Sequence, residues 1–246
     1  MTEYFQLTQL KKADRLWATW DSTPDDWEVS LCSTGTIEHW DGQRFRTNLA
    51  VSVGYSRRDE LLIWGWFSGC LVHESLLSEF EGQGIAGYRL KPATVRFRDG
   101  RLSTEYQQLV VVGWAGVASE ESGIHLDEKC RFCHSAIYSK LCHPEKLIDW
   151  NQWTGEDFFT VWPVGYMLIT RRVAELLQSL KVKSFSLEEP DESWVGRNRF
   201  HVARLSSWMP DDVARKYGEP LGLENGAATW APMSKVRRPK LPKVQF

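Results

Sequence analysis

The pattern of apolar and polar positions in the first half of the chain is typical of β-strands. Apolar residues run continuously through Leu61–Phe67 instead of alternating with polar ones, which indicates a strand covered on both faces. The dipeptide Asp99-Gly100 marks a turn between two further runs. Because the runs are short and bounded by Gly, Pro, Asn or Asp, we expect antiparallel strands over Asn48–Val53, Glu60–Phe67, Ala86–Leu90, Thr94–Phe97 and Gln107–Trp114.

Helical periodicity is clearest in the second half. Val173, Leu176, Leu177 and Leu180 recur at the spacing of one buried helix face, and Thr170 is placed to be the N-cap. The remaining predicted elements are a helix over Glu74–Phe80 ending at Gly82, a strand over Val182–Leu187, and a helix over Asp211–Tyr217 ending at Gly218.

A polar stretch over Ala118–Ser122 separates two parts of the chain and serves either as a linker or as a loop. We therefore distinguish a β-rich N-terminal region over 1–118, a second region over 119–234 and a basic tail over 235–246. A length of 246 residues suits one large domain or two small ones, so the first two regions are either separate or one continuous domain. The tail is basic and interrupted by proline, and we expect it to be mobile or loosely docked.

The charge balance argues against a nucleic-acid partner. The chain has 30 Lys and Arg against 32 Asp and Glu, a net charge of −2, so it lacks a general basic field. Met1–Leu10 has no basic segment followed by an apolar one, and the longest apolar stretches fall short of the roughly 20 residues that span a bilayer. We expect a cytoplasmic protein without a membrane partner.

The strongest local signal is a cluster of cysteines and histidines. In a reducing compartment such a cluster indicates metal before disulfide, and a C-x-x-C turn supplies two thiolates from one tight loop. The members fall within nineteen residues and are His125, Cys130, Cys133, His134, Cys142 and His143. This pattern predicts a zinc site.

Neighbouring side chains in extended backbone point to opposite faces, so one residue of each adjacent Cys-His pair is the better ligand. We take Cys130, Cys133 and Cys142 as metal ligands, with His125 as the fourth by elimination. His143 or His134 could replace one of these four. Three thiolates are typical of a structural zinc rather than a catalytic one. The alternative is buried free thiols and surface imidazoles with no metal.

Signatures of catalysis are missing from the sequence. It has no Gly-x-Ser-x-Gly elbow, no phosphate-binding loop and no zinc-protease or deaminase motif, so we assign no catalytic residues and no organic cofactor. Asp149, Glu156 and Asp157 lie close to the cysteine cluster in sequence, and we interpret them as solvated or capping residues. The alternative to a non-enzyme is a zinc-dependent hydrolase or nucleic-acid-processing enzyme with an open metal position.

Aromatic residues are concentrated just after the cysteine cluster. Five large rings fall within thirteen residues, at Trp150, Trp153, Phe158, Phe159 and Trp162. We interpret Phe158, Phe159 and Trp162 as core residues that pack against the predicted Thr170–Leu180 helix. A binding surface is the alternative, because Trp residues are favoured interface anchors.

The order of motifs over Gly113–Glu189 resembles the bacterial double-CXXCG-motif proteins and related immunity-protein domains. The resemblance rests on the cysteine pair, a Tyr-Ser stretch, the pattern W-x-G-x-D-F-F-x-V-W-P, a Thr-Arg-Arg-Val-Ala helix and a Val-x-x-Phe strand. Two departures stand out: His134 follows Cys133 where the family has Gly, and Cys142-His143 replaces the second C-x-x-C-G.

The resemblance implies a protein of a polymorphic toxin system, in which a small cytoplasmic immunity protein binds and neutralises a toxin of sibling cells. We therefore expect a non-catalytic, antitoxin-type protein stabilised by structural zinc, with a cognate protein toxin as partner. The expected fold class is α+β: a mainly antiparallel sheet with few short helices and a zinc-knuckle-like loop before a C-terminal helix–strand unit.

Overall fold

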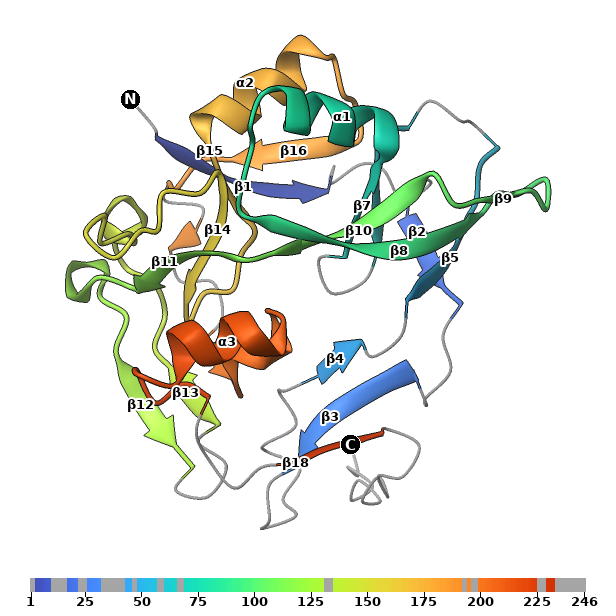
Figure 1. Cartoon of the computed structure of the whole chain (residues 1–246). Helices are drawn as coiled ribbons and strands as arrows, with labels where there is room; N and C mark the ends of the chain where they lie inside the picture. The colour runs from blue at the N-terminus through green and yellow to red at the C-terminus, as the bar shows by residue number, and fades with distance from the viewer. Residues whose placement is uncertain are drawn as a thin grey trace, which may run out of the picture.

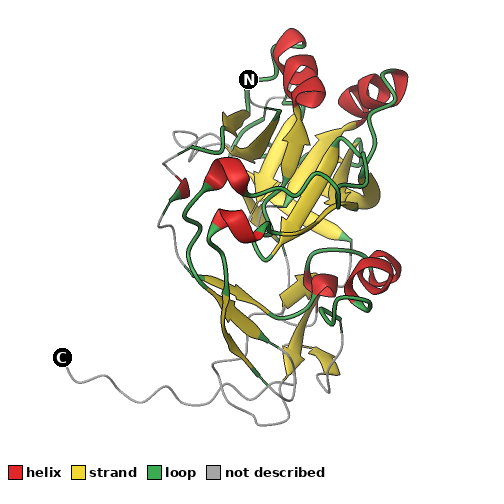
Figure 2. Ribbon diagram, turned by 90° about the vertical axis from the view of Figure 1, so that its left-hand side faces the viewer, coloured by secondary structure: helices red, strands yellow, loops and turns green. Residues whose placement is uncertain are grey.

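The predicted α+β class is confirmed, with mostly antiparallel sheets and three α-helices in the part of the chain described below. The structure is a computed structural model (Figures 1 and 2). It describes residues 3–9, 17–21, 26–31, 43–45, 48–56, 60–65, 69–130, 135–191, 194–195, 199–224 and 229–232. Within these ranges, each helix is too short or too polar to cross a bilayer.

A seven-stranded sheet forms most of the first half. Its order is β10 (Tyr106–Val111), β7 (Cys70–His73), β6 (Leu62–Gly65), β2 (Trp17–Trp20), β5 (Leu49–Val53), β8 (Tyr88–Arg96) and β9 (Leu102–Ser103). An additional pairing of β10 with β8 closes the order from β10 to β8 into a ring of six strands. The sheet is therefore a small closed barrel, to which β9 is appended.

Alternation along the barrel strands separates two cores. Ile63, Leu71, Val51 and Val95 point inward and fill the barrel together with Tyr106. The intervening side chains, such as those of Trp64 and Val72, point outward into a second cluster. The continuous apolar run that predicted a strand covered on both faces is thus explained by a barrel wall with a core on each side.

A five-stranded sheet lies beside the barrel. Its order is β11 (Gly113–Val117), β14 (Phe158–Trp162), β15 (Leu168–Thr170), β1 (Tyr4–Gln9) and β16 (Phe185–Glu188), with only the β11–β14 pairing parallel. Helices α1 (Glu74–Gly82) and α2 (Arg171–Ser179) lie close together at the top of Figure 1. Leu77 of α1 and Leu177 of α2 belong to the core shared by the barrel wall and this sheet.

Two three-stranded sheets complete the described fold. One contains β12 (Leu126–Lys129), β13 (Ala136–Tyr138) and β17 (Phe200–Val202), and the other contains β18 (Thr229–Pro232), β3 (Trp27–Leu31) and β4 (Gln43–Phe45). Helix α3 (Asp211–Gly218) lies between them in Figure 1, preceded by the short 3-10 helix η8 (Leu205–Ser207). Two further 3-10 helices are η5 (Glu120–Ser122) and η6 (Pro144–Lys146).

Strands from before and after the predicted boundary near Ser119 pair in the same sheets. Strand β1, from the start of the chain, lies between β15 and β16, and β11 pairs with β14. The terminal strand β18 pairs with β3. This pairing favours one continuous domain over two. The predicted tail over 235–246 lies outside the described residues.

Two strand predictions differ from the structure in their limits. The runs Ala86–Leu90 and Thr94–Phe97 belong to a single strand, β8, which passes through Pro92 where its partner changes from β10 to β5. The run Gln107–Trp114 is instead two strands, because the backbone N–H groups of Val112 and Gly113 donate to Gly87 and direct the chain into the second sheet. Both differences arise from tertiary pairing.

The predicted helices are confirmed near the expected positions, and α2 buries Val173 and Leu177 as expected. Thr170 occupies the N-cap position of α2, but its hydroxyl donates to Asp157 instead of capping the helix. The burial predicted for the aromatic run is also confirmed, since Phe158, Phe159 and Trp162 in β14 are at most 2% exposed. Of these three, Phe158 shares a core cluster with α2, whereas Phe159 and Trp162 belong to two other clusters.

Candidate functional site

The cysteine cluster lies on a hairpin formed by β12 and β13. At its tip, the backbone N–H of Cys130 donates to the carbonyl of Ser135 over 2.8 Å. At its base, the N–H of Ser139 donates to the carbonyl of His125 over 2.9 Å. Cys130 is half-buried, while Cys133 and His134 lie outside the described residues. The hairpin thus places Cys130 and His125 at opposite ends.

Cys142 belongs to the base of the hairpin. Its N–H donates to Ser122, and its side chain lies against Gly123, where an added Cβ would be 2.8 Å from the Cβ of Cys142. His125 is exposed, with Nε2 3.1 Å from Asp127 Oδ1. Cys142 is exposed as well. The two predicted ligands at this end are held by local contacts.

One zinc ion bound by all four predicted ligands does not fit this hairpin. Cys130 and His125 are five residues apart along a strand, which corresponds to about 17 Å at the usual rise per residue. Tetrahedral zinc requires ligand atoms within about 2.0–2.3 Å of one ion. Among the described residues no group of three or more His, Cys, Asp or Glu is placed to hold a metal. The structural zinc site stays a prediction.

The acidic residues near the cluster have different roles. Asp157, expected to be solvated or capping, is buried at the start of β14. Its carboxylate accepts hydrogen bonds from the Ala86 N–H, the Thr170 hydroxyl and Arg172 at 3.1, 2.9 and 3.3 Å. Asp149 is exposed and accepts from the Gln152 side chain. Asp157 therefore joins three segments of the fold.

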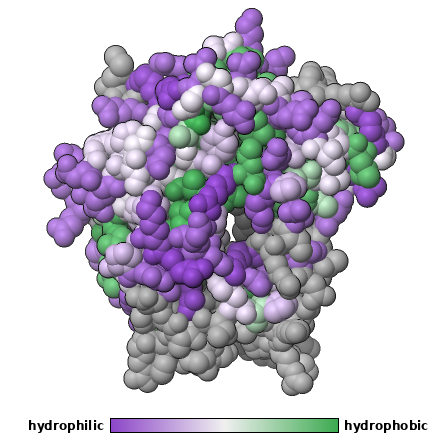
Figure 3. Space-filling model, in the orientation of Figure 1, coloured by the Kyte–Doolittle hydropathy of each residue, from purple (hydrophilic) through white to green (hydrophobic). Residues whose placement is uncertain are grey.

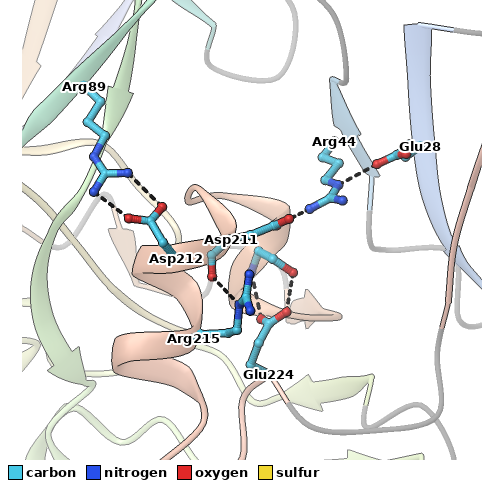
Figure 4. Close-up of polar contacts among 8 residues, drawn as sticks. Glu28, Arg44, Arg89, Asp211, Asp212, Arg215 and Glu224 are labelled. Atoms are coloured by element: carbon cyan, nitrogen blue, oxygen red, sulfur yellow. Dashed lines mark hydrogen bonds and ion pairs between the residues drawn. The ribbon is translucent and has the colours of Figure 1, made fainter.

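A second group of polar side chains surrounds the first turn of α3 (Figure 4). The carboxylate of Asp212 accepts hydrogen bonds from both terminal nitrogens of Arg89, a residue of barrel strand β8, over 2.8 and 2.7 Å. The side-chain hydrogen bond from Arg89 lowers the pKa of Asp212, and the same bond raises the pKa of Arg89. Two adjacent carboxylates also suit the positive end of a helix dipole. Strand β8 is thereby tied to the start of α3.

Asp211 makes the matching contact on the other side. It accepts a hydrogen bond from Nη1 of Arg44 in β4. Nε of Arg44 donates to Glu28 of β3 over 2.8 Å, and its guanidinium lies 4.2 Å from the centre of the Trp230 ring. The start of α3 therefore bridges the barrel and the β18-β3-β4 sheet.

A cavity of about 480 Å³ lies inside this bridge. It corresponds to the hollow in the middle of the face shown in Figure 3. Its walls come from β3, β4, β8, β10 and the segment from η8 to the start of α3, and include Glu28, Arg44, Lys91, Gln108, Ser207 and Trp208. We call it the barrel-mouth cavity, because Lys91 and Gln108 belong to the barrel strands β8 and β10.

The barrel-mouth cavity was not predicted from the sequence. Its residues come from five separate stretches of the chain and form no local motif. One signal was available: on β8, charged residues occupy positions 89 and 91 in the same alternating series as the apolar positions 93 and 95.

Fold and site together define an α+β protein in which a closed six-stranded barrel, the β18-β3-β4 sheet and the segment from η8 to α3 line a cavity. No known family model matches the sequence, and no curated protein does so either.

Proposed function

We propose that this protein is a non-catalytic immunity protein that binds and neutralises a cognate bacterial protein toxin. The observation that carries the proposal is that Gly113–Glu189, where the family resemblance lies, supplies four of the five strands of one sheet and its helix α2. The motif residues Phe158, Phe159 and Trp162 are buried within it. The resemblance therefore concerns most of one sheet and the helix packed on it, which supports a shared architecture.

The burial of the motif residues also indicates which parts of the protein would contact a toxin. Buried motif residues specify the sheet, so a toxin would be recognised by surfaces outside them. The sequence has two acidic runs, one over Asp25–Glu28 and one over Glu188–Glu192. Glu28 of the first run pairs with Arg44, and Glu188, Glu189 and Asp191 of the second run have interactions of their own. We therefore expect recognition through surfaces other than these acidic runs.

Co-expression tests the proposal. The product of the neighbouring open reading frame, expressed alone in a bacterial host, should arrest growth, and this protein should restore growth and co-purify with that product. The matched control uses two glycine variants: Gly113→Ala, which disturbs the scaffold, should lose protection, while Gly82→Ala, which meets open space, should retain it. Persistent growth arrest in the presence of folded protein would contradict the proposal.

A further inference from the structure

The inside of the barrel changes from apolar to polar at one end. On β8, Val95 and Ala93 are buried in the barrel core, and the alternation places Lys91 next on the same face. On β10, Tyr106 is in the core, and Gln108 follows on its face. Gln108 pairs directly with Lys91 in the register. These two side chains form the first polar layer beyond the apolar interior.

Lys91 has an unusual environment for a lysine. It lines the barrel-mouth cavity, and no hydrogen bond or ion pair joins its side chain to any other residue in the described ranges. Burial lowers its pKa, and the nearby Arg44 guanidinium lowers it further. Partly buried lysines are normally paired, because desolvation of an unpaired charge is costly. A cation without a partner thus faces the cavity.

The surrounding carboxylates are already engaged. Glu28 and Asp211 both bind Arg44, and Asp212 on the adjacent turn binds Arg89. The formal charges of the described lining residues Glu28, Asp211, Arg44 and Lys91 therefore sum to zero, and the ammonium group of Lys91 is the one among these four without a direct ion-pair contact.

Two buried polar atoms at the same cavity also lack partners. They are Oε1 of Gln108 and Oγ of Ser207, two atoms that belong to residues lining the cavity, from β10 and from η8. Nearly all buried polar atoms in proteins are paired with protein, water or ligand. An amide oxygen accepts a hydrogen bond, whereas a hydroxyl both donates and accepts. The cavity wall thus offers a cation, an acceptor and a hydroxyl.

The cavity has the size and the apolar surface of a small-molecule site. Its volume of about 480 Å³ lies within the common range for ligand pockets. Val110, Trp208 and Met209 add apolar wall beside the polar groups. Mouths of β-barrels are among the places where such sites occur.

We propose that the barrel-mouth cavity binds a small hydroxylated organic anion. Its carboxylate or phosphate group accepts hydrogen bonds from Lys91 and Ser207. A hydroxyl of the same molecule donates to Oε1 of Gln108, and its carbon skeleton contacts Trp208 and Met209. This inference does not rest on toxin neutralisation, so either proposal can fail alone.

Isothermal titration calorimetry with four probes tests the site. Malate and glycerol 3-phosphate represent the carboxylate and phosphate forms, and malamide and glycerol are their neutral analogues. We expect one of the two anions to bind the full-length protein at millimolar concentration or below, with the neutral analogues at least about tenfold weaker. Which anion binds tells a carboxylate ligand from a phosphate ligand.

The decisive variant is Lys91→Met, which removes the ammonium group and keeps most of the side-chain stem. It should weaken anion binding at least about tenfold. The control variant Lys183→Met, at an exposed position outside the cavity, should bind like the wild type. Thermal melts without ligand check folding, and Lys91→Met should melt no lower than the wild type because its lysine has no partner to lose.

Three results would overturn the inference. They are the absence of binding of either anion to the wild type, equal binding by a folded Lys91→Met variant, and binding of a neutral analogue as tight as that of its anion.

Discussion

Gly113 leaves no room for a side chain. An added Cβ would lie 2.1 Å from the carbonyl oxygen of Phe158 and 2.9 Å from the Cβ of Glu156. Because the nearest atom belongs to the backbone of a buried strand, it is not free to move aside. We predict that Gly113→Ala lowers the free energy of unfolding by about 3 kcal/mol, measured by urea denaturation.

Gly82 provides the matched control, since an added Cβ there meets nothing within 4 Å. Alanine at the end of helix α1 should raise the free energy of unfolding by about 0.5–1 kcal/mol. Similar stabilities for the two alanine variants would show that β11 and β14 are not in this close contact.

The lowered pKa of Lys91 leads to a prediction about how the free energy of unfolding depends on pH. Its pKa in the folded state is below its usual value, first because of burial and then because of Arg44. At a pH between the folded-state pKa and the unfolded-state value of about 10.4, Lys91 binds more protons in the unfolded chain than in the folded protein. The contribution of Lys91 to the free energy of unfolding therefore rises with pH in this range. We predict that Lys91→Met is more stable than the wild type near neutral pH, and that the difference shrinks as the pH approaches about 10.

Urea unfolding of both proteins across this pH range measures the difference. The difference in unfolding free energy between the wild type and Lys91→Met removes the contribution of groups that titrate in both proteins. Among the described residues, the other charged groups that line the same cavity are Glu28 of β3, Arg44 of β4 and Asp211 of α3. Carboxylates and guanidinium groups ordinarily titrate outside this range. A difference that stays constant with pH would contradict the burial of Lys91.

At the same scale, the sequence identified Phe158, Phe159 and Trp162 as core residues. Their apolar character alone is sufficient reason for burial. Lys91 was not selected from the sequence, because it lies between the predicted strands Ala86–Leu90 and Thr94–Phe97, where a lysine is ordinarily solvated. Its environment is made by Arg44 and Ser207, which are distant along the chain.

At the scale of elements, Asp157 joins the start of β14 to the connection after α1 and to the start of α2. Its carboxylate accepts hydrogen bonds from Ala86, Thr170 and Arg172, and it is 7% exposed. We predict that Asp157→Ala costs about 2–4 kcal/mol of unfolding free energy, since the N–H of Ala86 and the Thr170 hydroxyl lose their part-buried acceptor.

The control for this prediction is Glu175→Ala, which removes an exposed carboxylate from α2. It should change the free energy of unfolding by no more than about 0.5 kcal/mol. Equal effects of the two substitutions in chemical denaturation would argue that Asp157 has no special role.

The β12–β13 hairpin predicts which substitutions affect metal content. His125 and Cys142 lie at the base, whereas Cys130 lies at the tip. We therefore predict that His125→Ala and Cys142→Ser leave the zinc content unchanged, measured by elemental analysis of protein purified without chelator. Loss of zinc in both Cys130→Ser and Cys142→Ser would mean that the tip and the base of the hairpin come together around one ion. Less than about half an equivalent of zinc in the wild-type protein would reject zinc binding.

The elements that the sequence predicted well have strong local signals. The spacing of Val173, Leu176 and Leu177 suffices for α2, because an amphipathic helix is specified within its own length. Strand β1 is short, and its hydrogen-bond partners β15 and β16 lie far away in the sequence. It was therefore missed, although Tyr4, Phe5 and Leu7 are apolar and buried.

At the scale of the whole molecule, β1 makes the two regions of the sequence depend on each other. It lies between β15 and β16 and buries Tyr4, Phe5 and Leu7. We predict that removal of residues 1–9 abolishes cooperative unfolding, because two strands lose their pairing and the shared core opens. Circular dichroism during thermal unfolding measures this.

Thr8→Ala, which keeps β1 in place, is the control and should unfold cooperatively. If the chain without residues 1–9 retained a cooperative transition near that of the wild type, the second region would be an independent domain.

The sequence by itself determined the fold class, the three helices, the buried aromatic strand and the concentration of cysteines and histidines, because each depends on residue type and local spacing. Only the tertiary structure decided that the barrel closes, that β1 inserts into the second sheet and that Cys130 is separated from His125 and Cys142. It also decided that Lys91 faces a cavity without a partner. These features depend on pairing between distant segments, and such pairing leaves no periodic signal in a single sequence.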